Sequence, residues 1–280
     1  MNRALIIDSG ATKADWSLMQ AGELVSEFKT PGIPPFFMSD EEISAQLAVI
    51  ATQLGDTVDG IFFYGTGCKA ESSRKRLHTA FSAAFPSAAA IEIETDVLGA
   101  ARALCGRQAG IACILGTGSN SVWYDGAQVL QNSGGYGYIL GDEGSGAVLG
   151  RELIIAWLNR ELPAELAQAF DAEYGLSRDA VIERVYRGET PSRFLAGFTP
   201  FLSAHLVSAF VQELLQRQFH LFIRRCVLPY PDARRLPVHF TGSVAYYFRG
   251  VLEGVLSEAG LQAGTFLTAP MEGLRAFHRV

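Results

Sequence analysis

The sequence predicts an α/β protein of two domains that share one plan, and three observations support this. Short apolar strands alternate with amphipathic helices through the first part of the chain. The same pattern restarts near residue 111. The chain has 280 residues, 49% of them hydrophobic, which is enough for two cores. We expect an N-terminal domain over residues 1–107 and a C-terminal domain over residues 108–269 with a helical insertion. Residues 270–280 are expected to form a helix that could fold back on the first domain.

The first domain is expected to begin with three strands and to continue with helices and strands in alternation. Ser39 and Glu42 form a capping box before a helix whose apolar face is Ile43, Leu47, Ile50 and Leu54. Strands are predicted at residues 5–7, 14–19, 24–28, 61–64 and 91–94, and helices over 40–54, before residue 86 and over 97–104, which gives the order β-β-β-α-β-α-β-α.

The second domain repeats the opening of the first. Residues 5–12 match residues 113–120 in register: in both, an apolar strand meets a glycine turn and a strand containing Trp returns. Asp125 and Gly126 are typical of a tight hairpin. Strands are predicted at residues 111–115, 121–124, 128–130 and 238–240, and helices through residues 144–227 and over 244–258.

Composition and charge exclude several classes of protein. The formal net charge is −6, so nucleic acid is not an expected partner. The apolar run at the N-terminus is too short for a signal peptide, and no stretch approaches the ~20 apolar residues of a membrane span. Four cysteines without a CxxC pair suit the cytoplasm, where we expect the protein to reside. The charges at residues 74–76, 224–225 and 234–235 are expected to be solvated.

Two glycine turns are candidate phosphate-binding sites. In the first, Gly10 allows close backbone approach, while Thr12 and Lys13 supply a hydroxyl and a positive charge. Asp8 could hold Mg²⁺ through a water molecule. Alone, this segment is more typical of an ordinary β-hairpin in which Asp and Thr cap their own turn. A second turn of the same kind occurs at the corresponding point of the repeat, formed by Gly116, Thr117 and Gly118.

A third glycine turn follows a later strand and begins a helix. Gly242 and Ser243 are small enough for a flat nucleobase to lie against the backbone. The alternative is a tight strand-to-helix turn with no ligand.

These three segments, in this order, resemble the two phosphate motifs and the adenosine motif of the superfamily that contains sugar kinases, actin and Hsp70 chaperones. Residues 134–145, which read GGYGYILGDEGS, are similar to the GGWGxxxGDEGS signature of N-acetylglucosamine kinases, grouped with the BadF/BadG/BcrA/BcrD ATPases. The resemblance spans essentially the whole chain. It implies the actin-like ATPase fold, in which two ribonuclease H-like domains enclose an interdomain cleft. It also implies an activity: a kinase that uses ATP and Mg²⁺ to phosphorylate the 6-hydroxyl of an amino sugar such as N-acetylglucosamine. It also allows a homodimer.

The resemblance assigns Asp96 as the catalytic base. Asp96 follows a strand and precedes a helix, where a carboxylate could accept the proton of an attacking hydroxyl. From position alone a helix N-cap is the other interpretation.

The resemblance also assigns residues to the sugar. These are Thr66, Asn120, Gly135, Tyr136 and Asp142, with Tyr136 standing where the vertebrate kinase has Trp. The other interpretation of this stretch is a glycine-rich surface loop. Pro34 replaces an asparagine that in the family reaches the sugar, which leaves N-acetylglucosamine, glucosamine and muramic-type sugars open.

Two other functions fit parts of the sequence. An ATPase activator of a CoA-ester dehydratase or reductase would share the phosphate motifs but needs cysteines for an iron–sulfur cluster. A non-catalytic sugar or nucleotide sensor would bind the same ligands without turnover.

Overall fold

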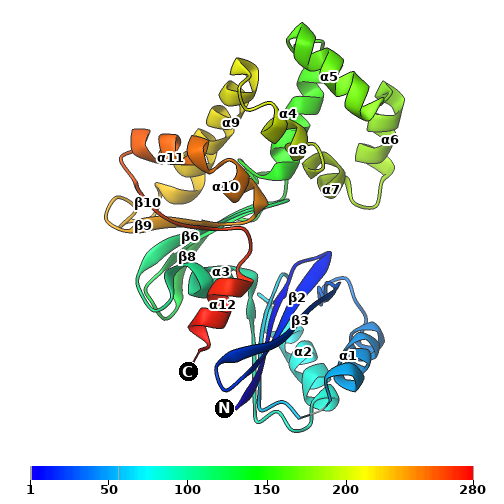
Figure 1. Ribbon diagram of the computed structural model, residues 1–280, viewed down its shortest axis with the longest axis vertical. Helices are drawn as coiled ribbons and strands as arrows, with labels where there is room; N and C mark the ends of the chain where they lie inside the picture. Colours follow the sequence, from blue (N-terminus) through cyan, green and yellow to red (C-terminus); the bar gives the residue numbers. More distant parts are fainter. Residues whose placement is uncertain (1, 56, 280) are drawn as a thin grey trace. The chain divides into compact units, whose positions relative to one another are not determined.

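The computed structural model describes residues 2–55 and 57–279, and Figure 1 shows the order of its elements. The chain forms two compact units. Unit 1 comprises Met1–Gln108, Gly126–Gln128 and Ala269–Val280, and unit 2 comprises Ala109–Asp125 and Val129–Thr268. Among the described residues, no helix combines the length and apolar character needed to cross a membrane.

Unit 1 is a five-stranded sheet of order β3-β2-β1-β4-β5, antiparallel from β3 to β1 and parallel from β1 to β5. Its strands are β1 (Arg3–Ser9), β2 (Lys13–Gln20), β3 (Glu23–Pro31), β4 (Gly60–Gly65) and β5 (Ala90–Thr95), and its helices are α1 (Asp40–Leu54), α2 (Glu71–Ala84), α3 (Asp96–Cys105) and α12 (Met271–Phe277). The element order expected for this part of the chain is confirmed, as is the capping box of Ser39 and Glu42.

Alternation along β1 gives unit 1 a core on each face of the sheet. Leu5 and Ile7 pack with residues of α1 and α2, whereas Ile6 packs with Met271 and Leu274 of α12. Figure 1 shows α1 and α2 along one face of the strands. The C-terminal helix is therefore part of the core of unit 1.

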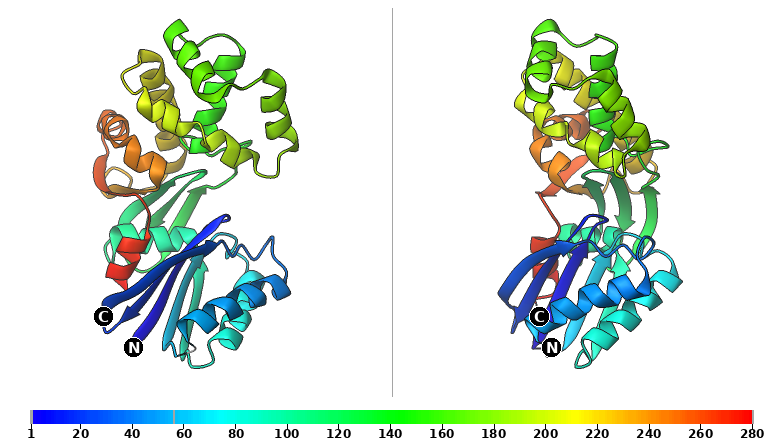
Figure 2. Two further views of the ribbon diagram at one scale, coloured as in Figure 1. Left: turned by 45° about the vertical axis from the view of Figure 1, so that its right-hand side comes forward. Right: turned by 90° about the vertical axis from the view of Figure 1, so that its right-hand side faces the viewer.

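Unit 2 repeats the sheet order as β8-β7-β6-β9-β10, again with an antiparallel hairpin and two parallel strands. Its strands are β6 (Gly110–Leu115), β7 (Ser119–Tyr124), β8 (Val129–Gly134), β9 (Pro237–Thr241) and β10 (Gln262–Leu267). The helices are α4 (Gly146–Leu158), α5 (Ala164–Tyr174), α6 (Arg178–Arg187), α7 (Pro191–Ala196), α8 (Thr199–Ala204), α9 (Ala209–Phe222), a π-helix η1 (Ile223–Val227), α10 (Ser243–Tyr247) and α11 (Arg249–Glu258). Figure 2 shows α4 to α9 gathered together.

The structure corrects two details of the second half. The helix expected over 244–258 is two helices, because the backbone at the buried Phe248 leaves helical geometry. Strand β10 was not predicted; it is an edge strand with one buried residue, Phe266, so its hydrophobic signal is weak.

The two glycine turns differ in length. The first hairpin stays paired up to Ser9 and Ala14, leaving residues 10–13 in the turn, whereas the second is paired up to Leu115 and Ser119, leaving residues 116–118. The expected residue-by-residue register of the repeat therefore ends at the turns.

Candidate active site

The carboxyl ends of the three parallel strands of unit 1 gather the candidate residues of that unit. Ser9 pairs with Gly65, and Gly65 pairs with Thr95, so the ends of β1, β4 and β5 lie in one row. Asp8 comes just before this row, and Thr66 and Asp96 come just after it. Ligands of such sheets bind beyond the carboxyl ends of the strands.

The first glycine turn is exposed, and residues 32 and 33, which follow β3, fix its backbone conformation. The amide of Gly10 donates to the carbonyl of Lys13 at 2.9 Å, and the amide of Gly32 donates to the carbonyl of Thr12 at 3.1 Å. A Cβ at Gly32 would lie 2.2 Å from the carbonyl oxygen of Gly10, so only glycine allows this approach. The amide of Ile33 donates to the Ser9 hydroxyl at 2.9 Å. Residues after β3 thus support the turn while its outer face stays open.

Asp8 lies in an excess of negative charge. Burial raises the pKa of Asp8 to about 7, and the charges of Asp96 and Asp15 add to this effect, while Lys13 opposes it. Asp15 is directly opposite Asp8 on β2, so both side chains lie on one face of the sheet. Asp15 forms ion pairs with Lys13 at 3.5 Å and with Lys29 at 3.3 Å. A cation would neutralise the negative charge that remains around Asp8. The carboxylates of Asp8 and Asp15 therefore fit a Mg²⁺ ion whose other ligands are mainly water and phosphate oxygens. Within residues 2–55 and 57–279, no group of three or more His, Cys, Asp or Glu side chains could hold a metal by itself.

Asp96 is the first residue of α3, and the N-cap of that helix is Thr95. The Thr95 hydroxyl accepts from the amide of Leu98 at 3.3 Å, so the capping role that competed for Asp96 belongs to its neighbour. One carboxylate oxygen of Asp96 accepts from the amide of Val97 at 2.9 Å. Burial is the main cause that raises the pKa of Asp96. A half-buried carboxylate with a raised pKa is a suitable general base.

The second glycine turn rests on the N-terminus of α4. The amides of Gly146 and Ala147 donate to the carbonyls of Gly116 and Thr117, at 2.8 and 3.1 Å. These bonds occupy the carbonyls of the turn. Among the residues that the structure describes, the amides of Thr117 and Gly118 have no hydrogen-bond partner, so they can donate to an anion.

Two buried hydroxyls next to this turn also lack partners within the described part of the chain. They are the side chains of Ser119, which follows the turn, and Thr241, which pairs with Ile114 across β6 and β9. Gly242 follows Thr241 with φ of 114°, and a Cβ there would lie 2.3 Å from the carbonyl oxygen of Leu115. The third glycine turn therefore lies against the second.

Asp142 joins the second turn to the glycine-rich loop. It has a φ of 59°, and its carboxylate accepts from the amide of Gly137 at 3.2 Å and from the amide of Ser119. A Cβ at Gly118 would lie 2.9 Å from its Oδ2. Burial raises the pKa of Asp142, and the charge of Glu143 adds to the effect.

Asn120 is oriented as a hydrogen-bond donor. Its Oδ1 accepts from the backbone amide of Ser121 at 2.9 Å and from the side-chain amide of Asn132 at 2.6 Å. Because a backbone N–H only donates, this contact fixes which atom is oxygen. A Cβ at Gly135 would lie 2.8 Å from Asn120 Nδ2. Tyr136, the next residue, is 68% exposed and is open to a ligand.

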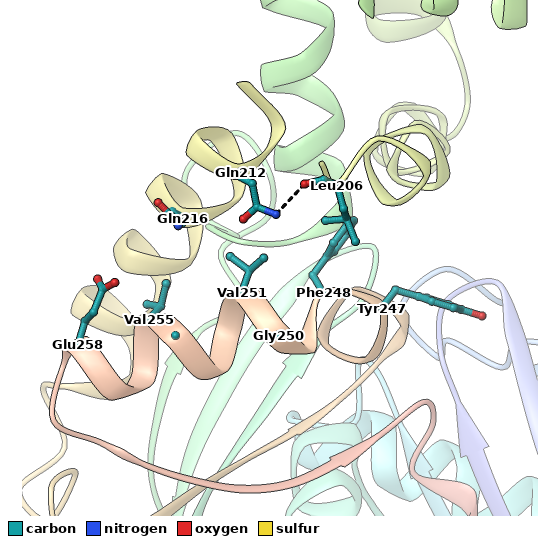
Figure 3. A pocket seen from close by; sticks show the side chains of 10 residues that line it. Leu206, Gln212, Gln216, Tyr247, Phe248, Gly250, Val251, Val255 and Glu258 are labelled. Atoms are coloured by element: carbon teal, nitrogen blue, oxygen red, sulfur yellow. Dashed lines mark hydrogen bonds between the residues drawn. The ribbon is translucent and has the colours of Figure 1, made fainter. Parts of the chain in front are cut away.

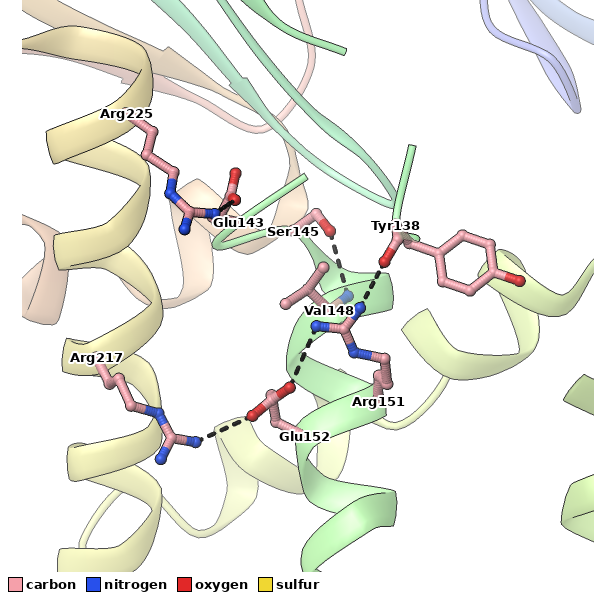
Figure 4. Close-up of polar contacts among 8 residues, drawn as sticks. All are labelled: Tyr138, Glu143, Ser145, Val148, Arg151, Glu152, Arg217 and Arg225. Carbon is pink, nitrogen blue, oxygen red and sulfur yellow. Dashed lines mark hydrogen bonds and ion pairs between the residues drawn. The ribbon is translucent and has the colours of Figure 1, made fainter. Parts of the chain in front are cut away.

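An ion pair and a hydrogen bond that sequence reasoning missed hold the glycine-rich loop in place (Figure 4). Glu143, which is buried, pairs with Arg225 of the π-helix; Arg225 is 57% exposed, so the expectation that it is solvated is confirmed, although it also has a buried partner. Arg151 of α4 donates to the carbonyl of Tyr138 at 2.5 Å. The same expectation fails in unit 1 for Arg76, which donates to the carbonyls of residues 35 and 38 and pairs with Asp40 at 2.6 Å. No sequence motif marked these long-range partners.

The whole chain is similar to solved structures of sugar kinase type. A structure from Porphyromonas gingivalis described as a candidate N-acetylglucosamine kinase is 45% identical with a TM-score of 0.94, over 99% of this chain and 98% of that one. Another so described, from Chromobacterium violaceum, is 19% identical with a TM-score of 0.73, over 99% of each chain. A ROK family glucokinase from Streptomyces griseus, solved with glucose and AMPPNP, shares the fold at 14% identity and a TM-score of 0.57, over 98% of this chain and 97% of that one. No protein-family model and no curated protein matches the chain.

At this level of identity over nearly the full length, the chain belongs to the family of N-acetylglucosamine kinase-like proteins, which have the two-domain actin-like ATPase fold of sugar kinases.

Proposed function

We propose that this protein is an ATP-dependent kinase that phosphorylates the 6-hydroxyl of an amino sugar, with N-acetylglucosamine as the first candidate. The observation that carries the proposal is Asp96: it is half-buried at the start of α3, its pKa is raised, and Thr95 relieves it of capping the helix. A carboxylate at a strand end that accepts from the Val97 amide through one oxygen, and is not the N-cap of the helix, suits proton transfer.

In this proposal, Asp96 accepts the proton of the sugar 6-hydroxyl as that oxygen attacks the γ-phosphorus. The bond between the γ-phosphorus and the bridging oxygen breaks, and ADP leaves with the electron pair. Within unit 1, Thr12, Lys13 and the backbone of residues 10–13 are the groups proposed to bind phosphate oxygens, and within unit 2 they are the amides of Thr117 and Gly118. Asp8 would hold Mg²⁺ through water. When bound, Mg²⁺ neutralises charge on the phosphates.

For the sugar, the proposal uses the residues that the resemblance assigns, and hydrogen bonds fix the orientation of one of them, Asn120. Asn120 Nδ2 donates to a hydroxyl or to an acetamide oxygen, because its Oδ1 is occupied. Tyr136 covers an apolar face of the ring, Gly135 allows close approach, and Thr66 adds a hydroxyl. Asp142, which is buried, supports the turn and the loop by accepting from the amides of Ser119 and Gly137, and the proposal also assigns it to the sugar. The buried Pro34 supplies no side-chain amide. A cytoplasmic location and a homodimer complete the proposal.

ADP release with MgATP across glucose, glucosamine, N-acetylglucosamine and N-acetylmuramic acid tests the proposal. We expect an amino sugar to be the best acceptor. Asp96→Asn should lower kcat ~10²–10⁴-fold with little change in ADP binding by calorimetry. Thr95→Ala is the matched control: it should lower the free energy of unfolding by about 0.5–2 kcal/mol and keep most of the turnover per folded molecule.

Activity should also fall as pH falls through the pKa of Asp96, because only the ionised form accepts a proton. Since burial raises this pKa, the loss should begin at a higher pH than for an ordinary aspartate. Near-wild-type turnover by Asp96→Asn, or ADP release that no sugar stimulates, would contradict the proposal.

A further inference from the structure

One face of the sheet of unit 1 is covered by α3 and α12, and Tyr64 of β4 contacts both helices. Tyr64 is fully buried and packs with Ile6 of β1 and with Met271 and Leu274 of α12. It pairs with Asp8 of β1, so the two side chains lie on the same face of the sheet. The face that carries Asp8 is therefore the face that α3 and α12 cover.

Helix α3, which begins at Asp96, packs directly on the ring of Tyr64. A Cβ at Gly99 would lie 2.8 Å from Tyr64 Cβ and 2.9 Å from its Cγ, so only glycine allows this approach. Gly99 is nearly one helical turn after Asp96, about 4.5 Å along the axis. A Cβ at Gly273 of α12 would likewise lie 2.1 Å from the carbonyl oxygen of Ala103 in α3, and Figure 1 shows the two helices side by side. Tyr64 therefore sets the distance between the sheet and the first turn of α3, which carries Asp96.

The hydroxyl of Tyr64 connects α3 to the C-terminal segment. Arg102, one turn beyond residue 99, donates to the Tyr64 oxygen at 2.7 Å and pairs with Glu92 of β5. His278, directly after α12, places its Nε2 at 2.8 Å from the same oxygen. A guanidinium group only donates and a buried hydroxyl proton needs an acceptor, so Tyr64 donates to His278 Nε2. One hydroxyl thus joins β4, α3 and the end of α12.

His278 is kept in the neutral form that this hydrogen bond needs. Burial and the charges of Arg102 and Arg107 lower the pKa of His278 to about 4. The imidazole is therefore uncharged at neutral pH, and its Nε2 can accept. Its ring also stacks on Phe62, two residues before Tyr64 in β4, with 3.9 Å between the ring centroids. The position of His278 is thus fixed by packing as well as by the hydrogen bond.

We propose that Tyr64 is a positioning residue for Asp96: its ring sets the distance of α3 from the sheet, and its hydroxyl, bound to Arg102 and His278, keeps the helix there. This rests on the proposed kinase function, in which Asp96 is the base, and adds a residue that acts through Asp96 without touching a ligand. A base must lie within hydrogen-bond reach of the proton that it accepts, and a displacement of ~1 Å can cost about 10²-fold in rate. Changes around Tyr64 should therefore lower kcat and leave nucleotide binding unchanged.

Gly99→Ala tests the contact with the ring. Carbon atoms in ordinary contact are about 3.5–4.0 Å apart. A methyl carbon that would lie 2.8 Å from Tyr64 Cβ must therefore move α3 away from the sheet by about 1 Å. Alanine favours a helix more than glycine does, so α3 itself should remain helical. We expect kcat to fall ~10–100-fold, with no change in ADP affinity by calorimetry.

Gly254→Ala in α11 of unit 2 is the control for this substitution. Gly254 also lies inside a helix, but a Cβ there would meet no atom within 4 Å. The space is explained by a groove between α9 and α11, which Gly254 lines together with Val251 and Val255 (Figure 3). The variant gains the same methyl group without displacing a helix, so it should keep the wild-type kcat.

Tyr64→Phe and His278→Ala test the hydroxyl. Each removes one partner of the hydrogen bond and keeps an aromatic ring at position 64. We expect kcat to fall about three- to tenfold, the range of one hydrogen bond, with no change in the KM for MgATP. Because both substitutions break the same bond, the double variant should lose no more kcat than the weaker of the two single variants. His278→Gln offers a side-chain carbonyl to the Tyr64 hydroxyl and should recover part of the loss.

Hydrogen exchange of the α3 amides provides a reading that needs no turnover. Tyr64→Phe should speed exchange in α3 and leave exchange in α1 unchanged. Wild-type kcat in Gly99→Ala, or in both Tyr64→Phe and His278→Ala, would overturn the inference and leave the kinase function intact. A loss of kcat with an equal loss of ADP affinity would also overturn it, because the effect would then not act through Asp96. If no sugar is phosphorylated, the proposed function fails, while the exchange rates still decide whether Tyr64 holds α3.

Discussion

Asp8→Asn should make the metal-free protein more stable at pH 8 while removing its activity. The pKa of Asp8 rises from 3.8 to about 7 in the folded protein. Each pKa unit corresponds to 1.36 kcal/mol, so the buried charge lowers the free energy of unfolding by up to about 4 kcal/mol above pH 7. Asparagine has nearly the same shape and no charge, so it should recover most of this. The same substitution removes the proposed Mg²⁺ contact, and kcat with MgATP should fall by at least about 100-fold.

The pH dependence of the stability gained by Asp8→Asn shows whether the charge of Asp8 causes it. A carboxyl whose folded pKa is raised stabilises the folded state below its unfolded pKa, and this stabilisation is lost as pH rises through the folded pKa. The gain from Asp8→Asn should therefore decrease to about 2 kcal/mol at pH 5 and vanish near pH 3. Urea unfolding in EDTA at pH 8, 6.5 and 5, followed by tryptophan fluorescence, measures it.

Asp59 provides a control of opposite sign. It accepts from the backbone amides of Asn2 and Arg3, at 2.7 and 2.8 Å, and these bonds lower its pKa. Asp59→Asn should therefore destabilise the protein at neutral pH, and the loss should shrink as pH falls through the lowered pKa. The reasoning about Asp8 is refuted if Asp8→Asn destabilises the protein at pH 8, or if its gain is the same at pH 8 and pH 5.

Two further predictions concern the supports of the site. Gly32→Ala places a methyl group 2.2 Å from the Gly10 carbonyl oxygen and must displace the first turn, so the KM for MgATP should rise at least about tenfold. Gly250→Ala is the control: its methyl group meets no atom within 4 Å, so the KM for MgATP should not change. An unchanged KM for Gly32→Ala would show that residues 10–13 do not bind the phosphates. Arg225→Gln leaves the buried Glu143 carboxylate without its cation and should lower the free energy of unfolding by about 1–3 kcal/mol. Adding Glu143→Gln to Arg225→Gln should restore most of this stability in urea unfolding, and no restoration would mean that the pair is not coupled.

Much of the fold could be predicted because its signals are local. The buried apolar run of β1, the capping box at Ser39 and the glycine turns each lie within a few residues of sequence, so propensity and patterning reveal them. Strand β10 escaped prediction because an edge strand with one buried side chain leaves little pattern. The break at Phe248 escaped because burial of that side chain overrides a continuous helical pattern.

The candidate site divides in the same way. The sequence alone identified the three glycine turns and Asp8 as candidates, because each is a short motif at a strand end, whereas Asp96 became a candidate through the resemblance to the kinase family. Only the tertiary structure decided that Asp15 faces Asp8 across the hairpin, that Gly32 supports the first turn, that Thr95 frees Asp96 from capping, and that α3 packs on Tyr64. These relations join residues through strand register and helix packing, and the free energy that fixes them comes from burial across the whole unit, which no local run of residues encodes.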